Sequence, residues 1–172
     1  MADRFTAANE RQAQLLSFLL KLNLFAIPLY AILILDLSFV PLQRLIADTT
    51  FSLLNTAGFN PAISDLMISI PIKNGSWAAV INWDCTAWKS MLAFFALTMA
   101  TNRNARTKTL GLAIFLPLIF AANLARIFFM FFYVRTFDIA YYEIVHAAVW
   151  SWGMIAAVLF FWFVWMRKMD KW

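Results

Sequence analysis

The sequence predicts an all-α integral membrane protein with four transmembrane helices, an extracytoplasmic amphipathic helix and a short β-hairpin. Its 172 residues are 63% hydrophobic and 13% charged, with a mean hydropathy of +0.73. A soluble domain is about half apolar and about a quarter charged. Four apolar stretches reach the roughly 20 residues that a helix needs to cross a hydrocarbon core of about 30 Å. The length fits one membrane-embedded domain over residues 1–172.

The first predicted span covers residues 15–35 and follows a polar segment, residues 1–14. No small-residue cleavage site follows the span, so we interpret it as an uncleaved membrane anchor and not as a signal peptide. Lys21 lies near its start, where a long alkyl chain can carry the ammonium group to the near interface.

The segment that follows, residues 36–80, is predicted to lie outside the membrane. Residues 41–57 alternate apolar and polar positions with a helical period, which indicates an amphipathic helix on the membrane surface. Residues 67–72 and 77–81 are typical of strands, and the Asn74-Gly75 pair between them is a strong hairpin signal. We expect the hairpin to lie over the second span and to frame an outward-facing site.

The remaining predicted spans cover residues 81–100, 110–134 and 139–166. Basic residues in the connecting segments set the orientation, because they are enriched on the cytoplasmic side. Eight lie on one side: Arg4, Arg11, Arg103, Arg106, Lys108, Arg167, Lys168 and Lys171. Three lie on the other: Arg44, Lys73 and Arg135. We therefore expect a multi-pass protein of the cytoplasmic (inner) membrane with both termini in the cytoplasm.

Composition also excludes several kinds of site. A single cysteine, Cys85, excludes an intrachain disulfide, a CxxC redox pair and a thiolate metal cluster. A single histidine, His146, excludes bis-histidine haem ligation within one chain. The isoelectric point near 9.7 does not indicate a nucleic-acid partner, because most basic residues flank apolar spans. We expect no metal and no cofactor.

Cys85, Arg126 and His146 are the candidate catalytic residues, and the predicted topology brings them to similar depths. Arg126 and His146 lie about seven or eight residues from the outer ends of their spans, which is roughly 10 Å below the outer surface. Cys85 opens the second span, about one helical turn in. Three groups from three helices are thus predicted to meet in a recess that opens outward.

These residue types suit acyl transfer by a cysteine nucleophile. A cysteine attacks as thiolate, and a nearby imidazole or cation lowers its pKa. His146 can act as acid or base near neutral pH. Arg126 keeps its positive charge and can stabilise a tetrahedral oxyanion.

Two further residues are candidate supporting groups. Glu143 shares a helical face with His146 and could orient the imidazole, and Asn123 has the same relation to Arg126. We interpret Asn123 as an interhelical hydrogen-bond donor or acceptor more readily than as a catalytic group. Asp84 would raise the pKa of the neighbouring thiol unless it points away or pairs with Lys89, and we interpret these two as an ion pair.

Each candidate also has an ordinary explanation when taken alone. A lone cysteine in a membrane helix is usually a small apolar filler. A lone histidine near an interface is usually a hydrogen-bonded polar residue. Arg126 could pair with Glu143 or with phospholipid headgroups, although a charge at that depth marks a site by default.

Three motifs occur in order along the chain. Cys85-Thr86 stands at the head of one predicted membrane helix, Asn123-Leu-Ala-Arg126-Ile127 in the next and His146 in the last. This ordered set resembles the exosortase/archaeosortase family. The resemblance covers about residues 60–165. Histidine as the third residue is similar to the bacterial exosortases, and the short chain resembles their compact type, with the exosortase H subfamily as the candidate.

The resemblance implies a function and a partner. Family members are thought to cleave C-terminal sorting signals of exported proteins, each made of a short motif, a transmembrane helix and a basic cluster. Cleavage is thought to pass through a thioacyl enzyme and to end in transfer to an acceptor. Cys85 would then be the nucleophile, Arg126 the oxyanion or carbonyl binder and His146 the acid/base. Many members have glycine two residues after the cysteine, where this chain has Ala87.

Two other functions remain open on the sequence. The chain could be a non-enzymatic scaffold subunit of an export or exopolysaccharide complex, with Arg126 and Glu143 paired to fix helix packing. Alternatively, the same cysteine could transfer a lipid acyl chain. The acceptor nucleophile, the sorting motif and any requirement for membrane lipid are not specified by the sequence.

Overall fold

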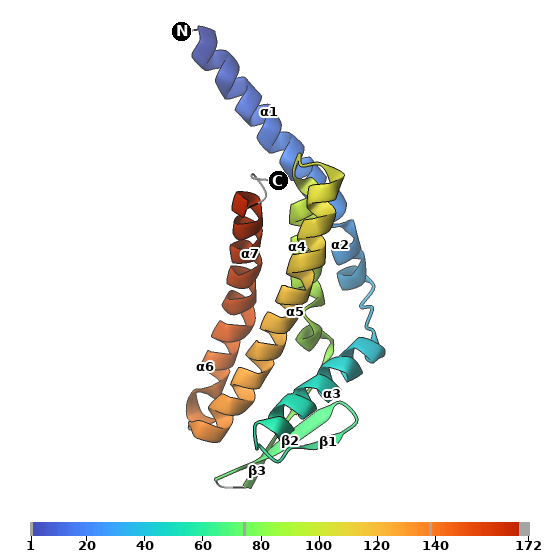
Figure 1. Ribbon diagram of the computed structural model, residues 1–172, viewed down its shortest axis with the longest axis vertical. Coiled ribbons are helices and arrows are strands. Elements are labelled where there is room, and N and C mark those ends of the chain that lie inside the picture. The colour runs from blue at the N-terminus through green and yellow to red at the C-terminus, as the bar shows by residue number, and fades with distance from the viewer. Residues whose placement is uncertain (1, 74, 138, 169–172) are drawn as a thin grey trace.

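The computed structural model describes residues 2–73, 75–137 and 139–168. The predicted turn residue Asn74 and the basic residue Lys171 lie outside these ranges. Helices make up most of the described chain, and a small sheet lies at one end of them (Figure 1). Three other parts of the chain lie toward the opposite end (Figure 1). They are the N-terminal end of α1 (Ala2–Phe25), the connection between α4 (Trp88–Ala100) and α5 (Ala105–Thr136), and the end of α7 (Met154–Lys168).

The first predicted span is a bent pair of helices, α1 (Ala2–Phe25) and α2 (Ile27–Ile34). The two helices meet at Ala26 with a bend of 41° between residues 9–25 and 27–34. Pro28 in the first turn of α2 accounts for the break, because proline lacks the N–H that would continue the helical ladder. Lys21 donates a 2.6 Å hydrogen bond to Asn102 in the α4–α5 connection, which fits its predicted place at the near interface.

The predicted amphipathic helix is confirmed as α3 (Val40–Thr56). Its buried positions share one face of the helix: Gln43, Ile46, Ala47, Thr50 and Leu54. This face packs on the sheet and on α5, where it forms a core with Ile68 and Phe131.

The predicted hairpin is also confirmed. Strands β2 (Met67–Ile72) and β3 (Gly75–Val80) pair antiparallel, with Ile70 opposite Trp77 and Ile68 opposite Ala79. A third strand, β1 (Ala62–Ser64), adds to the other edge of β2 and gives the order β1-β2-β3. The sequence analysis missed β1, which is only three residues long.

The prediction of one continuous helix over residues 81–100, with Cys85 near its beginning, was wrong. Residues Trp83–Thr86 form a separate 3-10 turn, η1, and α4 begins only at Trp88 and ends at Ala100. Ala87 separates the two because it adopts a left-handed conformation, with φ 60° and ψ 8°. A right-handed helix cannot continue through such a residue. Cys85 therefore lies in a turn ahead of α4.

The third predicted span is confirmed as one long helix, whereas the fourth is interrupted. Helix α5 (Ala105–Thr136) begins at Asn104, whose side chain accepts a 2.8 Å hydrogen bond from the Thr107 N–H. The residues of the fourth predicted span form a 3-10 turn (Ile139–Tyr141), α6 (Tyr142–Ala147), a π-helical turn (Ala148–Gly153) and α7 (Met154–Lys168). Such π-turns add a residue to the helical ladder and are frequent at functional sites.

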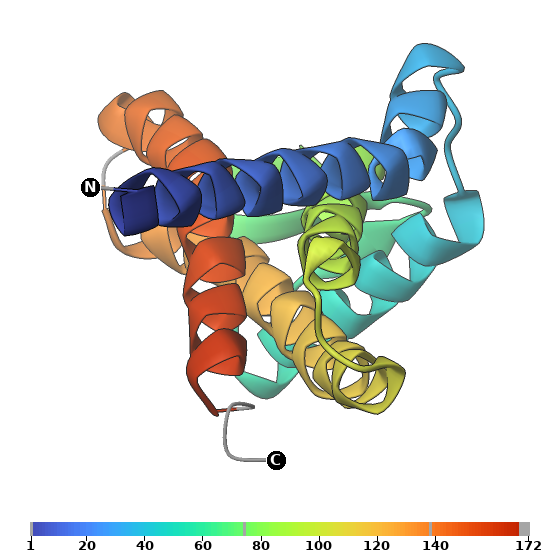
Figure 2. The same ribbon diagram turned by 90° about the horizontal axis from the view of Figure 1, so that it is seen from above.

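Among the described helices, α5 alone is long and apolar enough to cross a bilayer as an unbroken helix. The α1–α2 pair meets the same test only as a broken span, and α4 is a shorter apolar helix of 13 residues. Helices α4, α5 and α7 share a second core that includes Phe94, Ile119 and Trp165. Viewed from above, α1 crosses over these helices (Figure 2).

Candidate active site

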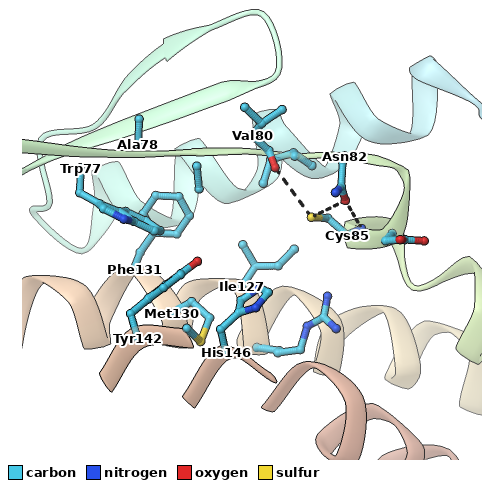
Figure 3. Close-up of a pocket in the computed structure, with 14 residues that line it drawn as sticks. Trp77, Ala78, Val80, Asn82, Cys85, Ile127, Met130, Phe131, Tyr142 and His146 are labelled. Carbon is cyan, nitrogen blue, oxygen red and sulfur yellow. Dashed lines mark hydrogen bonds between the residues drawn. The ribbon is translucent and has the colours of Figure 1, made fainter. Parts of the chain in front are cut away.

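Cys85 is held in its turn by the side chain of Asn82. The Asn82 Oδ1 accepts hydrogen bonds from the Cys85 backbone N–H at 3.1 Å and from the Sγ–H, also at 3.1 Å. The Val80 carbonyl oxygen lies 4.0 Å from Sγ (Figure 3). Asn82 is thus the N-cap of η1, a position that asparagine favours because its side chain satisfies a free N–H. The thiol is 7% exposed.

The carbonyl of the same cysteine is held from α5. Asn123 Nδ2 donates a 2.7 Å hydrogen bond to the Cys85 backbone oxygen, and the Asn123 side chain is fully buried. The interpretation of Asn123 as a hydrogen-bond partner between segments is confirmed. Its partner is the backbone of Cys85. Orientation of Arg126 was the less favoured alternative for Asn123.

The three predicted residues line one cavity of about 480 Å³. Its walls come from β3, the loop into η1, α5 and α6. Arg126 lies one turn after Asn123 on α5 and is 9% exposed, and His146 is partly buried on α6. Figure 3 shows Cys85 and Asn82 on one wall of the cavity, with Tyr142 and His146 on the opposite wall. The predicted convergence of Cys85, Arg126 and His146 is therefore present in the fold.

Aromatic contacts hold the imidazole side of the cavity. The Tyr142 and His146 rings stack with centroids 5.4 Å apart and 23° between their planes. The Trp77 ring packs edge-on against Tyr142 at 5.4 Å and against Phe131 at 5.1 Å. The hairpin is thereby connected through Trp77 to the helix that carries His146.

The two acidic residues nearest the candidate site in sequence, Asp84 and Glu143, differ in their position relative to the cavity. Asp84 lines the cavity and pairs with Lys89 at 2.7 Å, as the sequence analysis expected. Both side chains are about half exposed, so this ion pair contributes little to stability. Glu143 is exposed and is not among the residues that line the cavity. Glu143 therefore lies outside the cavity that Cys85, Arg126 and His146 line.

Cys85 is buried between groups of opposite charge. Arg126 and Asp84 both line the cavity that contains its thiol. A buried thiol needs a base in order to react as a nucleophile.

Sequence analysis missed Asn82 and Tyr142. A signal for Asn82 exists, because asparagine three residues before Cys85 fits the N-cap of a short turn. Tyr142 lies four residues before His146, which places the two rings on one helical face.

Comparison with known proteins identifies a matching family model. The family model described as transmembrane exosortase (EpsH) matches residues 5–164. No curated protein and no solved structure matches the chain. The matched range includes all residues that line the cavity.

Proposed function

Because the chain belongs to the transmembrane exosortase family, we propose that it is a membrane-embedded cysteine transpeptidase. It cleaves C-terminal sorting signals of exported proteins through a thioacyl intermediate and transfers them to an acceptor. The observation that carries this proposal is that Cys85, Arg126 and His146 line one cavity. A thiol, a fixed cation and a titratable ring are the groups that nucleophilic acyl transfer requires.

The proposed topology has four crossings of the cytoplasmic membrane, with both termini in the cytoplasm. The crossings are α1–α2, α4 with the η1 turn before it, α5, and α6–α7 with their π-turn. The sheet and α3 lie at one end of this bundle, whereas the basic α4–α5 connection and the end of α7 lie toward the other (Figure 1). This separation supports an extracytoplasmic sheet and a cavity that opens outward.

In the first half of the proposed reaction, Cys85 attacks the carbonyl carbon of the scissile peptide bond. Its Sγ–H proton passes to His146, which acts as the general base. Arg126 binds the negatively charged oxygen of the tetrahedral intermediate. The imidazolium then gives its proton to the leaving amine, and a thioester remains on Cys85.

In the second half, an acceptor amine or water attacks the thioester. His146 takes the proton of this nucleophile and returns a proton to the departing Sγ. The partners are an exported protein that carries the signal, the acceptor and the surrounding membrane lipid. Asn82 and Asn123 hold the turn that carries Cys85 throughout, because they bind the Cys85 backbone N–H and carbonyl oxygen. The hydrogen bond from Sγ–H to Asn82 Oδ1 is lost when the proton leaves the sulfur.

Co-expression with tagged reporters tests this function. Each reporter carries an exported domain and a C-terminal signal, and the panel varies the short motif that precedes the transmembrane helix. We expect the wild-type protein to shorten at least one reporter, and Cys85→Ala, at equal abundance, to shorten none. Full processing by Cys85→Ala, or no processing of any reporter by the wild type, contradicts the proposed function.

A further inference from the structure

One edge of strand β3 has no partner strand. In the sheet order β1-β2-β3, β3 pairs with β2 along residues 75–80, and within the described residues no strand pairs with its other edge. An open strand edge presents backbone N–H and C=O groups that can pair with another extended chain.

This open edge forms a wall of the cavity that contains Cys85. The consecutive residues 77–82 all line the cavity. Successive side chains of a strand point to opposite faces of the sheet, so an unbroken run of lining residues means that the backbone edge itself faces the cavity. Figure 3 shows this strand running along one side of the cavity from Trp77 to Val80, with Cys85 just beyond its end.

Hydrogen bonds identify which backbone groups point into the cavity. The Ile81 N–H donates to the Leu66 carbonyl at 2.8 Å, on the side of β2. Because direction alternates along a strand, Trp77 and Ala79 also face β2, and Ala78 and Val80 face the cavity. The Val80 carbonyl confirms this alternation, since it lies 4.0 Å from Cys85 Sγ.

We propose that the free edge of β3 binds the extended segment of the substrate as an added, parallel strand. The inference rests on the proposed function and adds the way in which that cavity holds its substrate. The N–H and C=O of Ala78 and the N–H of Val80 bind the substrate backbone, as in other peptide-binding proteins that extend a sheet. The bound strand then leads the scissile carbonyl toward Cys85.

The side chains around the free edge of β3 leave room for a bound polypeptide and offer it an apolar surface. Ala78 has a small, exposed side chain, so a chain can approach the strand closely. Trp77, Phe131 and Tyr142 form an aromatic surface in the same cavity, on which an apolar substrate side chain can lie. The parallel direction follows from the path of the chain, because β3 leads through η1 into α4, and the substrate leads from its cleavage segment into its own transmembrane helix.

Proline substitution tests whether the free edge of β3 binds the substrate. Ala78→Pro removes an N–H that faces the cavity without removing a bond to β2. We expect at least about tenfold less processing of the reporter that the wild type shortens, which corresponds to losing one or two hydrogen bonds. Ser76→Pro is the matched control, because Ser76 faces the same edge but does not line the cavity. Its processing should stay within about twofold of the wild type. Thermal unfolding in detergent checks that both variants are folded.

Synthetic peptides test the same inference without changing the protein. Each peptide copies the cleavage segment of the processed reporter and carries one N-methylated amide, and its inhibition of processing is measured. A strand on β3 predicts that inhibition is lost at alternate positions, because only alternate N–H groups face the edge. Unchanged processing by Ala78→Pro, or inhibition without this alternation, contradicts the proposal that substrate binds to the edge of β3. Neither result contradicts the proposed function.

Self-association of the edge is the competing outcome. In a Cys85→Ala background, Ala78→Cys provides a lone thiol on β3. A disulfide-linked dimer formed under oxidation, in the absence of any reporter, would assign the edge to a second copy of the chain and overturn the inference. We expect the variant to remain monomeric in this assay. If the wild type shortens no reporter, the proposed function fails and the inference fails with it.

Discussion

Asn123 Nδ2 donates a 2.7 Å hydrogen bond to the backbone oxygen of Cys85. Asn123 is fully buried on α5, one turn before Arg126. A single stretch of α5 therefore supplies a cavity-lining cation and holds the turn that carries the thiol. This hydrogen bond links two segments that lie 38 residues apart in the chain.

We expect Asn123→Leu to destabilise the protein and to loosen the η1 turn. Leucine has a similar size but leaves the buried carbonyl of Cys85 without this donor, a change that costs about 1–3 kcal/mol. Thermal unfolding in detergent should show a lower midpoint, and processing of the reporter should fall. Asn55→Leu, at an exposed position of α3, is the control and should leave both unchanged. An Asn123→Leu variant with the stability of the wild type would show that other contacts hold the turn.

We expect Arg126→Lys to lose most of the activity while the protein still accumulates. Lysine keeps the positive charge but not the planar, two-pronged donor geometry with which arginine binds an oxyanion. Loss of one such donor typically lowers kcat by about 100-fold or more. The measurement is the rate of reporter processing, normalised to protein abundance. Wild-type turnover by Arg126→Lys would assign the guanidinium a structural role.

Position 87 should accept glycine but not a β-branched residue. Ala87 has φ 60°, which glycine adopts without strain and which β-branched side chains strongly disfavour. We expect Ala87→Gly to change the free energy of unfolding by less than about 1 kcal/mol and Ala87→Val to cost more than about 2 kcal/mol. Ala93→Val, inside α4, is the control and should cost about 0.5 kcal/mol. Equal losses for the two valine variants would mean that the backbone relaxes at position 87.

Local patterns in the sequence predicted several elements well. The helical period of residues 41–57 corresponds to α3, and the two apolar runs around Gly75 correspond to the hairpin. The gathering of Cys85, Arg126 and His146 also followed from the sequence, because membrane topology constrains which ends of the helices lie together. The family resemblance that was drawn from these motifs is confirmed by the match over residues 5–164.

Other features depend on tertiary structure and could not be predicted. The left-handed backbone at Ala87 has no signal in an alanine side chain, so the separation of η1 from α4 was missed. The shared helical face of Glu143 and His146 suggested a contact, but α6 turns Glu143 toward the outside. The role of Asn123 was half predicted: hydrogen bonding was expected, but its partner is set by the packing of η1 on α5.

The central claim is that Cys85 carries the substrate as a thioester, and hydroxylamine trapping tests it most directly. Membranes that contain the wild-type protein and the processed reporter are treated with hydroxylamine, and the exported fragment is analysed by mass spectrometry. We expect a fragment that ends in a hydroxamate at the cleavage site, and none from Cys85→Ala at equal abundance. A hydroxamate formed by Cys85→Ala, or a wild-type reaction that yields only the free carboxylate at saturating hydroxylamine, would contradict the account.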